Sequence, residues 1–410
     1  MRKLIGPFTQ VITLENLPLK GAIQDEQLVV KANAGVLVND GVIETVDDFE
    51  TLVKDTANVE VETLTEPMVL LPGLVDAHTH ICFGGSRARD YAMRNAGKPY
   101  LEIARAGGGI LDSVRKTREA APETLVSSTY QRATRHLHEG VTTCEVKSGY
   151  GLSVEAELKM LEAIQQVDQT HAIDIVPTCL AAHMRGPEYQ DSILYLENII
   201  ENLLPKVKSQ GLASRVDIFI EDTAFSVEEG RRYLIQAQAM GFDITIHADQ
   251  FSTGGSKLAT ALGAVSADHL EASTDKEINA LALSDTVAVV LPGVSFGLGM
   301  DYAPGRKLLD RGACVAIATD WNPGSAPMGD LLLQAAVYGA VQKLSNAEVF
   351  AGITFRAAQA LNLQDRGQLV TGQLADFIGF ATSDYQEILY QQGKLKPSKV
   401  WKRGALCNEK

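Results

Sequence analysis

The stretch Leu71-Pro-Gly-Leu-Val-Asp-Ala-His-Thr-His80 joins an apolar run to two histidines that are separated by one residue. Side chains alternate between the two faces of a β-strand, so a strand here would direct His78 and His80 to the same side. Two imidazoles on one side of a strand suit the binding of a single metal ion. The run at residues 73–81 is also the first of a series that decides the fold.

Apolar runs rich in Val, Ile and Ala recur along the middle of the chain, with helix-like stretches between them. We count eight, at residues 73–81, 142–147, 174–183, 216–221, 243–247, 264–269, 287–291 and 314–319. Continuous β-branched runs are typical of strands that are covered on both faces, as in a parallel sheet. Eight strand–helix units in about 300 residues predict a TIM (β/α)8 barrel. A doubly wound open sheet is the alternative.

Both ends of the chain have the pattern of short strands. In residues 36–46, two apolar alternations flank Asn39-Asp-Gly41, which predicts a hairpin with a tight turn. Residues 367–380 and the short apolar runs that follow them look similar. We therefore predict that residues 1–65 and 361–410 together form one small β-sandwich domain, with the barrel at residues 66–360 inserted between them.

The 410-residue chain is acidic, because 37 Lys and Arg residues face 51 Asp and Glu residues, for a net charge of −14. We expect neither nucleic acid nor an anionic membrane as a partner of such a chain. The longest charge-free apolar stretch, residues 286–300, contains Pro292 and is too short to span a membrane. Five scattered cysteines without a CxxC pair indicate reduced thiols, and we expect a cytoplasmic protein.

Five of the eight histidines lie at or just past the carboxyl end of a predicted strand. They are His78, His80, His183, His247 and His269. In a (β/α)8 barrel these ends meet on the face that carries the chemistry, so we expect the five side chains to share one site. His136 and His138 lie in a helix-like stretch and His171 precedes a strand, and we expect all three at the surface.

The strand ends also offer a set of metal ligands. His247 ends the fifth predicted strand and Asp320 follows the eighth, so both could join His78 and His80 around one ion. Zinc and iron accept three imidazole nitrogens with one carboxylate oxygen, and a catalytic site keeps a position for water. We therefore predict one zinc or iron ion, divalent or trivalent, at these four side chains. A His-x-His pair alone would also be compatible with an ordinary strand.

These features together resemble the amidohydrolase superfamily. The shared motifs are the stretch at 71–80, histidines that end strands five and six, an aspartate that ends strand eight, and Gly372-Gln-Leu-Ala-Asp376. Members with two metals bridge them with a carboxylated lysine at the end of strand four. Here strand four ends in Ile220-Glu-Asp222, and the conspicuous Lys147 lies on strand two. The resemblance therefore implies one metal ion and not two.

Finer motifs resemble the imidazolonepropionase family within this superfamily. They are Phe83-Gly-Gly-Ser-Arg87, Glu145-Val-Lys-Ser-Gly-Tyr-Gly-Leu152, His247-Ala-Asp-Gln250, Asp268-His-Leu270 and Thr319-Asp-Trp-Asn-Pro-Gly-Ser325. All five occur in order at strand ends. The resemblance implies hydrolysis of the ring amide of 4-imidazolone-5-propanoate, a small anionic substrate, to N-formimidoyl-L-glutamate in histidine degradation. Water activated by the metal would be the nucleophile.

The resemblance also implies roles for single residues. His269 would act as the general base or orient the hydroxide, with a fifth metal ligand or a core histidine as the alternatives, and Asp320 would carry a proton to the ring nitrogen. Arg87 would clamp the propionate, since a guanidinium pairs bidentately with a carboxylate. The other substrate-contacting positions of the family match Tyr150, His183, Gln250, Asn322, Gly324 and Ser325. Because an amide cannot take a proton, Gln250 is limited to hydrogen bonding.

Two rival interpretations share the barrel fold but differ in function. A related one-metal hydrolase could act on another cyclic amide or deaminate a heterocycle, but a neutral heterocycle needs no carboxylate clamp such as Arg87. A catalytically inactive barrel that serves as a binding protein would be expected to lack metal ligands, and none is missing from this sequence. We therefore predict the imidazolone-ring hydrolase, and we expect a homodimer, the commonest oligomer.

Overall fold

The computed structural model describes residues 2–55 and 59–409, and these residues form two sheets of eight strands each. One sheet is a barrel of parallel strands that follow one another in chain order. Its strands are β6 (Leu74–Asp76), β7 (Val141–Lys147), β8 (Asp174–Ala182), β9 (Arg215–Phe219), β10 (Asp243–Ala248), β11 (Ser266–His269), β12 (Val287–Val290) and β13 (Val315–Ile317). Every predicted run overlaps one of these strands. The TIM barrel is therefore confirmed, and the doubly wound sheet is not the fold.

The barrel closes between its last strand and its first through contacts at and just beyond the carboxyl ends of both strands. Asp76 accepts hydrogen bonds from the backbone nitrogen of Thr319 at 3.0 Å and from its hydroxyl at 2.6 Å. One step further along, the backbone nitrogen of Asp320 donates to the carbonyl of His78 at 3.0 Å. Closure of the barrel thus brings two of the predicted metal ligands side by side.

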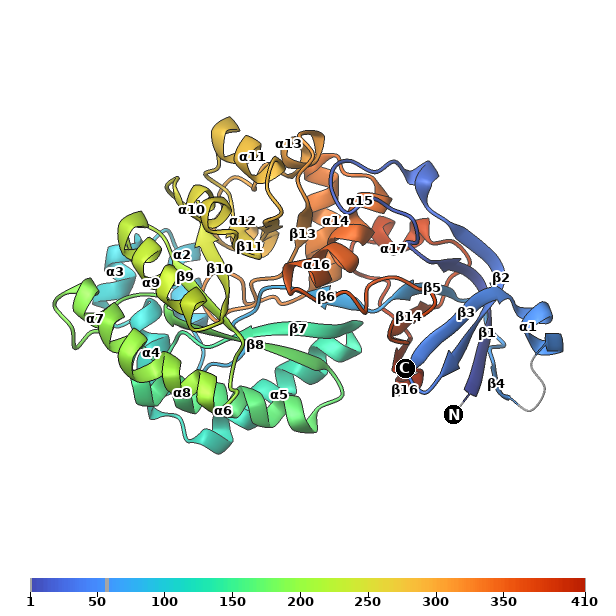
Figure 1. The fold of residues 1–410 in the computed structure, drawn as a ribbon, viewed down its shortest axis with the longest axis horizontal. Coiled ribbons are helices and arrows are strands. Elements are labelled where there is room, and N and C mark those ends of the chain that lie inside the picture. Colours follow the sequence, from blue (N-terminus) through green and yellow to red (C-terminus); the bar gives the residue numbers. More distant parts are fainter. Residues whose placement is uncertain (1, 56–58, 410) are drawn as a thin grey trace.

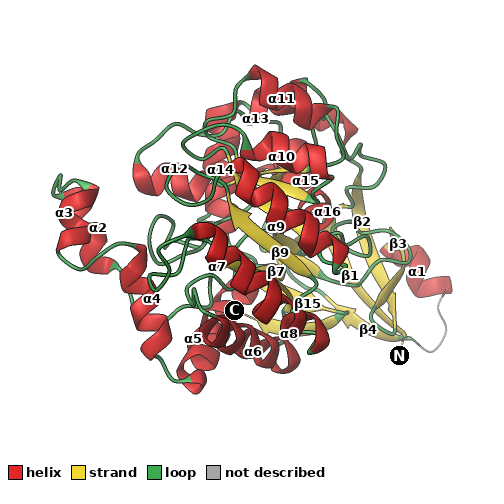
Figure 2. Ribbon diagram, turned by 60° about the vertical axis from the view of Figure 1, so that its left-hand side comes forward, coloured by secondary structure: helices red, strands yellow, loops and turns green. Residues whose placement is uncertain are grey.

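Helices cover the outside of the barrel (Figure 1). They are α4 (Ile110–Glu119), α5 (Pro122–His138), α6 (Val154–Thr170), α7 (Ser192–Asn198), the π-helical turn η2 (Ile199–Leu203), α8 (Leu204–Ser209), α9 (Val227–Ala239), α10 (Gly255–Leu262), α11 (Asp275–Ala282), α12 (Pro292–Leu298), α13 (Gly305–Asp310), α14 (Leu331–Gln342), α15 (Asn346–Gly352) and α16 (Phe355–Ala360). Two more, α2 (Ala88–Asn95) and α3 (Tyr100–Arg105), project away from the barrel (Figure 2). Among the described residues, no helix is long and apolar enough to cross a membrane.

The second sheet is built from both ends of the chain and lies beside the barrel (Figure 1). Its strands are β1 (Arg2–Ile12), β2 (Val30–Asn39), β3 (Val42–Asp48), β4 (Glu60–Thr63), β5 (Val69–Pro72), β14 (Phe377–Phe380), β15 (Lys399–Lys402) and β16 (Ala405–Glu409), with η1 (Asp25–Gln27), α1 (Phe49–Asp55) and α17 (Gln386–Tyr390) between them. β5 pairs with β1 on one side and with β14 on the other, so it joins the two ends of the chain. Phe8, Phe377 and Trp401 from both ends are buried in one core.

Charged side chains fasten this sheet to the barrel. Asp174, the first residue of β8, accepts from Lys402 Nζ at 2.7 Å and from Arg366 Nη1 at 2.6 Å. Lys402 also pairs with Asp376. Burial opposes the charge of Asp174, but Lys402 and Arg366 hold its pKa below the usual range. Lys402 is thus a buried ammonium held between two carboxylates.

One of the predicted surface histidines is in fact buried. His136 in α5 has no exposed surface, because its ring packs 4.8 Å from the Trp321 ring and lies 3.3 Å from Asp76 Oδ2. An α-helix turns neighbouring positions to different sides, so His136 faces the barrel while His138 faces solvent. His171 is partly exposed. The prediction of a surface position was therefore wrong for His136.

Candidate active site and metal centre

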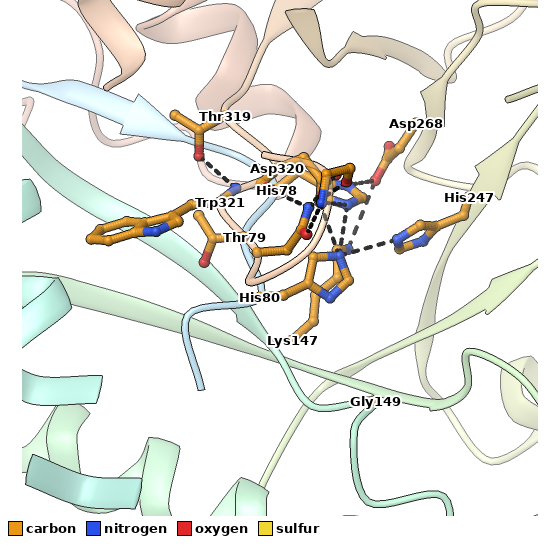
Figure 3. Close-up of polar contacts among 12 residues, drawn as sticks. His78, Thr79, His80, Lys147, Gly149, His247, Asp268, Thr319, Asp320 and Trp321 are labelled. Atoms are coloured by element: carbon orange, nitrogen blue, oxygen red, sulfur yellow. Dashed lines mark hydrogen bonds and ion pairs between the residues drawn. The ribbon is translucent and has the colours of Figure 1, made fainter. Parts of the chain in front are cut away.

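Four side chains from three strand ends converge at the mouth of the barrel (Figure 3). His78 and His80 follow β6, His247 lies in β10 and Asp320 follows β13. The Nε2 atom of His80 lies 3.2 Å from Nε2 of His78 and 3.3 Å from Nε2 of His247. Asp320 Oδ1 lies 3.2 Å from the same His80 atom and 3.5 Å from His78 Nε2. All four predicted ligands are buried, and the structure gathers them around one point.

Buried carboxylates hold the outer nitrogen of two of these imidazoles. His78 Nδ1 lies 2.7 Å from Asp268 Oδ2, and His247 Nδ1 lies 2.8 Å from Asp217 Oδ2. An ionised carboxylate accepts hydrogen bonds and cannot donate them, so each Nδ1 carries the hydrogen. In the neutral ring, Nε2 then presents its lone pair to the centre of the cluster, which is the arrangement of a metal-binding histidine.

The inward-facing atoms can hold a cation between them. Burial lowers the pKa of His80 and brings the pKa of His247 to about 4, so both rings are neutral. The lone pairs of His78 Nε2 and His247 Nε2 both point toward His80 Nε2, so one cation at this point could bind all three rings. Asp320 Oδ1 is buried and has no hydrogen-bond partner among the residues the structure describes. Three imidazole nitrogens and one carboxylate oxygen form a donor set that suits zinc or iron, so the residues present fit a metal ion.

The carboxylates around His78 attract positive charge to this point. Burial alone would lower the pKa of His78, but its contacts with the carboxylates of Asp268 and Asp320 outweigh it and raise the pKa to about 9. Burial would likewise raise the pKa of Asp320, yet His78 and His80 hold it well below its usual range. The site therefore favours a cation, which can be a proton on His78 or a metal ion in its place.

His269 adjoins the cluster and ends β11 in an unusual conformation. Its φ of 86° and the φ of 48° at Asp320 lie in the left-handed region, which residues other than glycine rarely adopt and which is typical of functional sites. A nitrogen of His269 lies within 4.8 Å of one nitrogen each of His78 and His247. This position is compatible with His269 as a general base, as a residue that orients the hydroxide, or as a fifth ligand.

A cavity of about 480 Å³ opens over the cluster. The residues predicted to contact substrate all line it, namely Arg87, Tyr150, His183, Gln250, Asn322, Gly324 and Ser325. His80, His247, His269 and Asp320 line the same cavity. A molecule bound here would therefore contact the cluster and the predicted substrate-binding residues together.

The Arg87 guanidinium is held in place at the edge of the cavity. Its Nε donates to Asp90 Oδ2 at 2.8 Å, and the same oxygen accepts from the backbone nitrogen of Gly109 at 2.8 Å. A Cβ atom added to Gly324 would lie 2.3 Å from Arg87 Nη1, so glycine at this position leaves room for the guanidinium. Asp90 occupies Nε and leaves the Nη nitrogens for an anion.

Two further wall residues have defined hydrogen-bonding roles. His183 Nδ1 donates to the carbonyl of Gly149 at 3.1 Å, and burial lowers the pKa of His183 to about 3, so its Nε2 is an acceptor. Burial raises the pKa of the Tyr150 phenol above its usual range, so the hydroxyl stays protonated and can donate. These two side chains thus offer one acceptor and one donor to a polar ring.

The side chain of Asn322 is used within the loop that follows β13. Its Nδ2 donates to Asp320 Oδ2 at 2.8 Å, and its Oδ1 accepts from the backbone nitrogens of Gly324 and Ser325 at 2.7 and 2.8 Å. Asn322 thereby occupies one oxygen of Asp320 and leaves the other to face the histidines. Direct contact of Asn322 with substrate stays a prediction.

Sequence reasoning missed two groups of residues in this region. Asp217 and Asp268 contact the outer nitrogens of the metal-binding histidines. Arg94 and Lys98 line the cavity beside Arg87. A signal existed for each group. An acid such as Asp217 within a strand buried on both faces needs a partner, and a spacing of seven places Arg87 and Arg94 on one side of a helix.

Solved structures with this fold include an adenosine deaminase from Xanthomonas campestris with bound zinc, at 18% identity and a TM-score of 0.74 over 99% of this chain and 93% of that one. A triazine hydrolase from Arthrobacter aurescens matches 100% of this chain and 95% of its own, at 16% identity and a TM-score of 0.71. At these identities the likeness concerns the fold alone.

Comparison of sequences gives the family. The model of the amidohydrolase family matches residues 69–407. The imidazolonepropionase of Deinococcus deserti is 42% identical over 98% of both chains. Those of Bacillus cytotoxicus and Fusobacterium nucleatum are 41% and 40% identical, over 98% of this chain and 96% and 97% of theirs. The chain therefore belongs to the amidohydrolase family and, within it, to the imidazolonepropionases.

Proposed function

We propose that this chain hydrolyses the ring amide of 4-imidazolone-5-propanoate to N-formimidoyl-L-glutamate, a step of histidine degradation. One observation carries the proposal: a guanidinium held for an anion, Arg87, shares one cavity with the cluster of histidines and Asp320, in a chain of this family. The substrate matches both parts of the cavity, since its propionate is an anion for Arg87 and its ring carries the amide that is hydrolysed at the cluster. A neutral heterocycle would offer no anion to the Nη nitrogens of Arg87.

The ion that we propose is a single zinc or iron, held by His78, His80, His247 and Asp320. When bound, such an ion lowers the pKa of a water molecule toward about 7 and so supplies a nucleophile at neutral pH. The protein keeps the ligand atoms available for it, because Asp217 holds the His247 ring by Nδ1 at 2.8 Å and points its Nε2 inward.

The remaining residues bind and orient the substrate. The Nη nitrogens of Arg87 pair with the propionate, and Arg94 and Lys98 add positive charge to the same wall in a chain whose net charge is −14. Tyr150 donates a hydrogen bond to the ring and His183 Nε2 accepts one. These contacts place the ring carbonyl carbon over the cluster, in reach of the attacking water.

Proton transfer completes the reaction. His269 takes the proton from the water whose oxygen bonds to the ring carbonyl carbon. As the C–N bond of the amide breaks, the proton that His269 took passes by way of Asp320 to the departing ring nitrogen, which completes the transfer of water to the amide. Gln250 has no basic group, and the pKa of about 3 that burial gives His183 keeps that ring from holding a proton. His269 is therefore our choice for the base.

The predicted homodimer and the cytoplasmic location both stay predictions. The cysteines at positions 82, 144, 179, 314 and 407 are free thiols, which agrees with the reducing compartment that we predict.

The proposed activity is tested by mixing the purified protein with fresh 4-imidazolone-5-propanoate and following the absorbance of the ring. We expect a loss of absorbance well above the spontaneous rate, which a chelator abolishes and added zinc or iron restores. If the metal-loaded protein does not accelerate the reaction, the proposed substrate is wrong.

Replacement of Arg87 tests the carboxylate clamp. We expect Arg87→Ala to raise KM by about 10–100-fold, the worth of a charged hydrogen-bonded pair, with metal content unchanged. Arg89→Ala is the matched control, because Arg89 is an exposed arginine two residues away that donates to the carbonyl of Ala106. Equal loss of metal and of substrate binding in Arg87→Ala would mean that Arg87 is structural.

Replacement of His269 separates its two possible roles. As a general base, His269→Ala should lower kcat by about 10²–10⁴-fold while the protein keeps its metal, as measured by steady-state kinetics and elemental analysis. The exposed His138→Ala serves as the control and should change neither quantity. Loss of metal from His269→Ala would make this residue a ligand and contradict its assignment as the base.

A further inference from the structure

Lys147 is a fully buried ammonium beneath the metal-binding cluster, and the proposed reaction does not use it (Figure 3). It is the last residue of β7. Its Nζ lies 2.8 Å from Asp217 Oδ2, 2.7 Å from Glu145 Oε2 and 3.8 Å from Asp268 Oδ2. An ion pair this deep gains little net stability from its charges alone, so a buried lysine calls for a specific function.

The carboxylates beside Lys147 are those that hold the metal-binding histidines. Asp217 Oδ2, 2.8 Å from the ammonium, is also 2.8 Å from His247 Nδ1. Asp268 Oδ2, on another side of the ammonium, lies 2.7 Å from His78 Nδ1. Lys147 is therefore the shared neighbour of two carboxylate–histidine pairs that come from different strands.

Glu145 is the third carboxylate beside the lysine, and it is itself held in place. Its Oε1 accepts a hydrogen bond from the hydroxyl of Thr178 and lies 3.8 Å from Arg215 Nε. Arg215 is in turn fixed by a hydrogen bond of 3.0 Å to the carbonyl of Ala360. The ammonium thus has a fixed position, from which it can set the spacing of the two aspartates.

The surroundings of Lys147 exclude the other role that a buried lysine has in this superfamily, that of a carboxylated bridge between two metals. Carboxylation needs a neutral amine and would place a fourth negative group among Glu145, Asp217 and Asp268. Burial alone would lower the pKa of Lys147, but Asp217, Glu145 and Asp268 together raise it above its usual range. Lys147 is held as a cation.

We propose that Lys147 is a positioning residue for the metal centre. By attracting Asp217 and Asp268 to one ammonium, it fixes the two carboxylates that orient the His247 and His78 rings, and so aims both Nε2 atoms at the ion. Without it, two like charges would face each other in the barrel interior, and the aspartates would move apart with their histidines. This proposal rests on the metal site proposed above.

The test compares Lys147→Met with Lys402→Met in the full-length protein. Lys402 is also a buried ammonium between two carboxylates, Asp174 and Asp376, but it joins the terminal sheet to the barrel. Both proteins are stripped of metal, checked for folding by circular dichroism and titrated with zinc against a chromophoric chelator. We expect Kd for zinc to rise by about 10–100-fold in Lys147→Met, the usual effect of losing support behind the ligands, and to stay unchanged in Lys402→Met.

A second measurement distinguishes a positioning role of Lys147 from a purely structural one. The visible spectrum of bound cobalt should change in Lys147→Met and not in Lys402→Met, because a purely structural lysine would not alter ligand geometry. If Lys147→Met does not fold, Lys147→Gln carries the same test. A folded Lys147 variant with unchanged zinc Kd and cobalt spectrum overturns the proposal. Failure of the unmodified protein to bind zinc or iron would instead overturn the proposed metal site itself.

Discussion

Imidazole nitrogens and a carboxylate oxygen that face one another at 3.2–3.5 Å inside a protein form a site that favours a positive charge between them. This constraint governs the mouth of the barrel. His78 and His247 are each tied by Nδ1 to a buried carboxylate, so neither ring can turn its Nε2 away. Asn322 likewise occupies one oxygen of Asp320 and leaves the other facing inward. The surrounding structure is thus organised to hold a cation.

The fold holds the metal-binding side chains from two levels of the barrel, an upper level at its mouth and a lower level in its interior. At the carboxyl ends of the strands, barrel closure sets Asp320 beside His78, and the cavity above carries Arg87 for an anionic substrate. Below, side chains from β7, β9 and β11 meet inside the barrel, where Lys147 lies among carboxylates. Residues of the upper level carry out the reaction that we propose. Residues of the lower level keep the Nε2 atoms of the histidines directed at the ion. Activity should therefore depend on residues that never touch the substrate.

The sequence predicted the upper level and missed the lower one for a physical reason. Strands of a parallel barrel are continuous apolar runs, and the histidines at their ends stand out in a chain with only eight. The pairing of Lys147 with Asp217 and Asp268 depends on the register of three strands that lie far apart in the sequence. His136 was misplaced for a related reason, since the side that a helix turns to the barrel is set by packing.

The central claim, one ion in a site that four side chains make, is tested most directly by counting metal. The protein would be stripped with a chelator, reloaded with excess zinc or iron, freed of unbound metal by gel filtration and measured by elemental analysis against protein concentration. The account predicts one ion per chain in the unmodified protein and a loss of that ion in His80→Ala. Two ions per chain, none, or full retention by His80→Ala would contradict it.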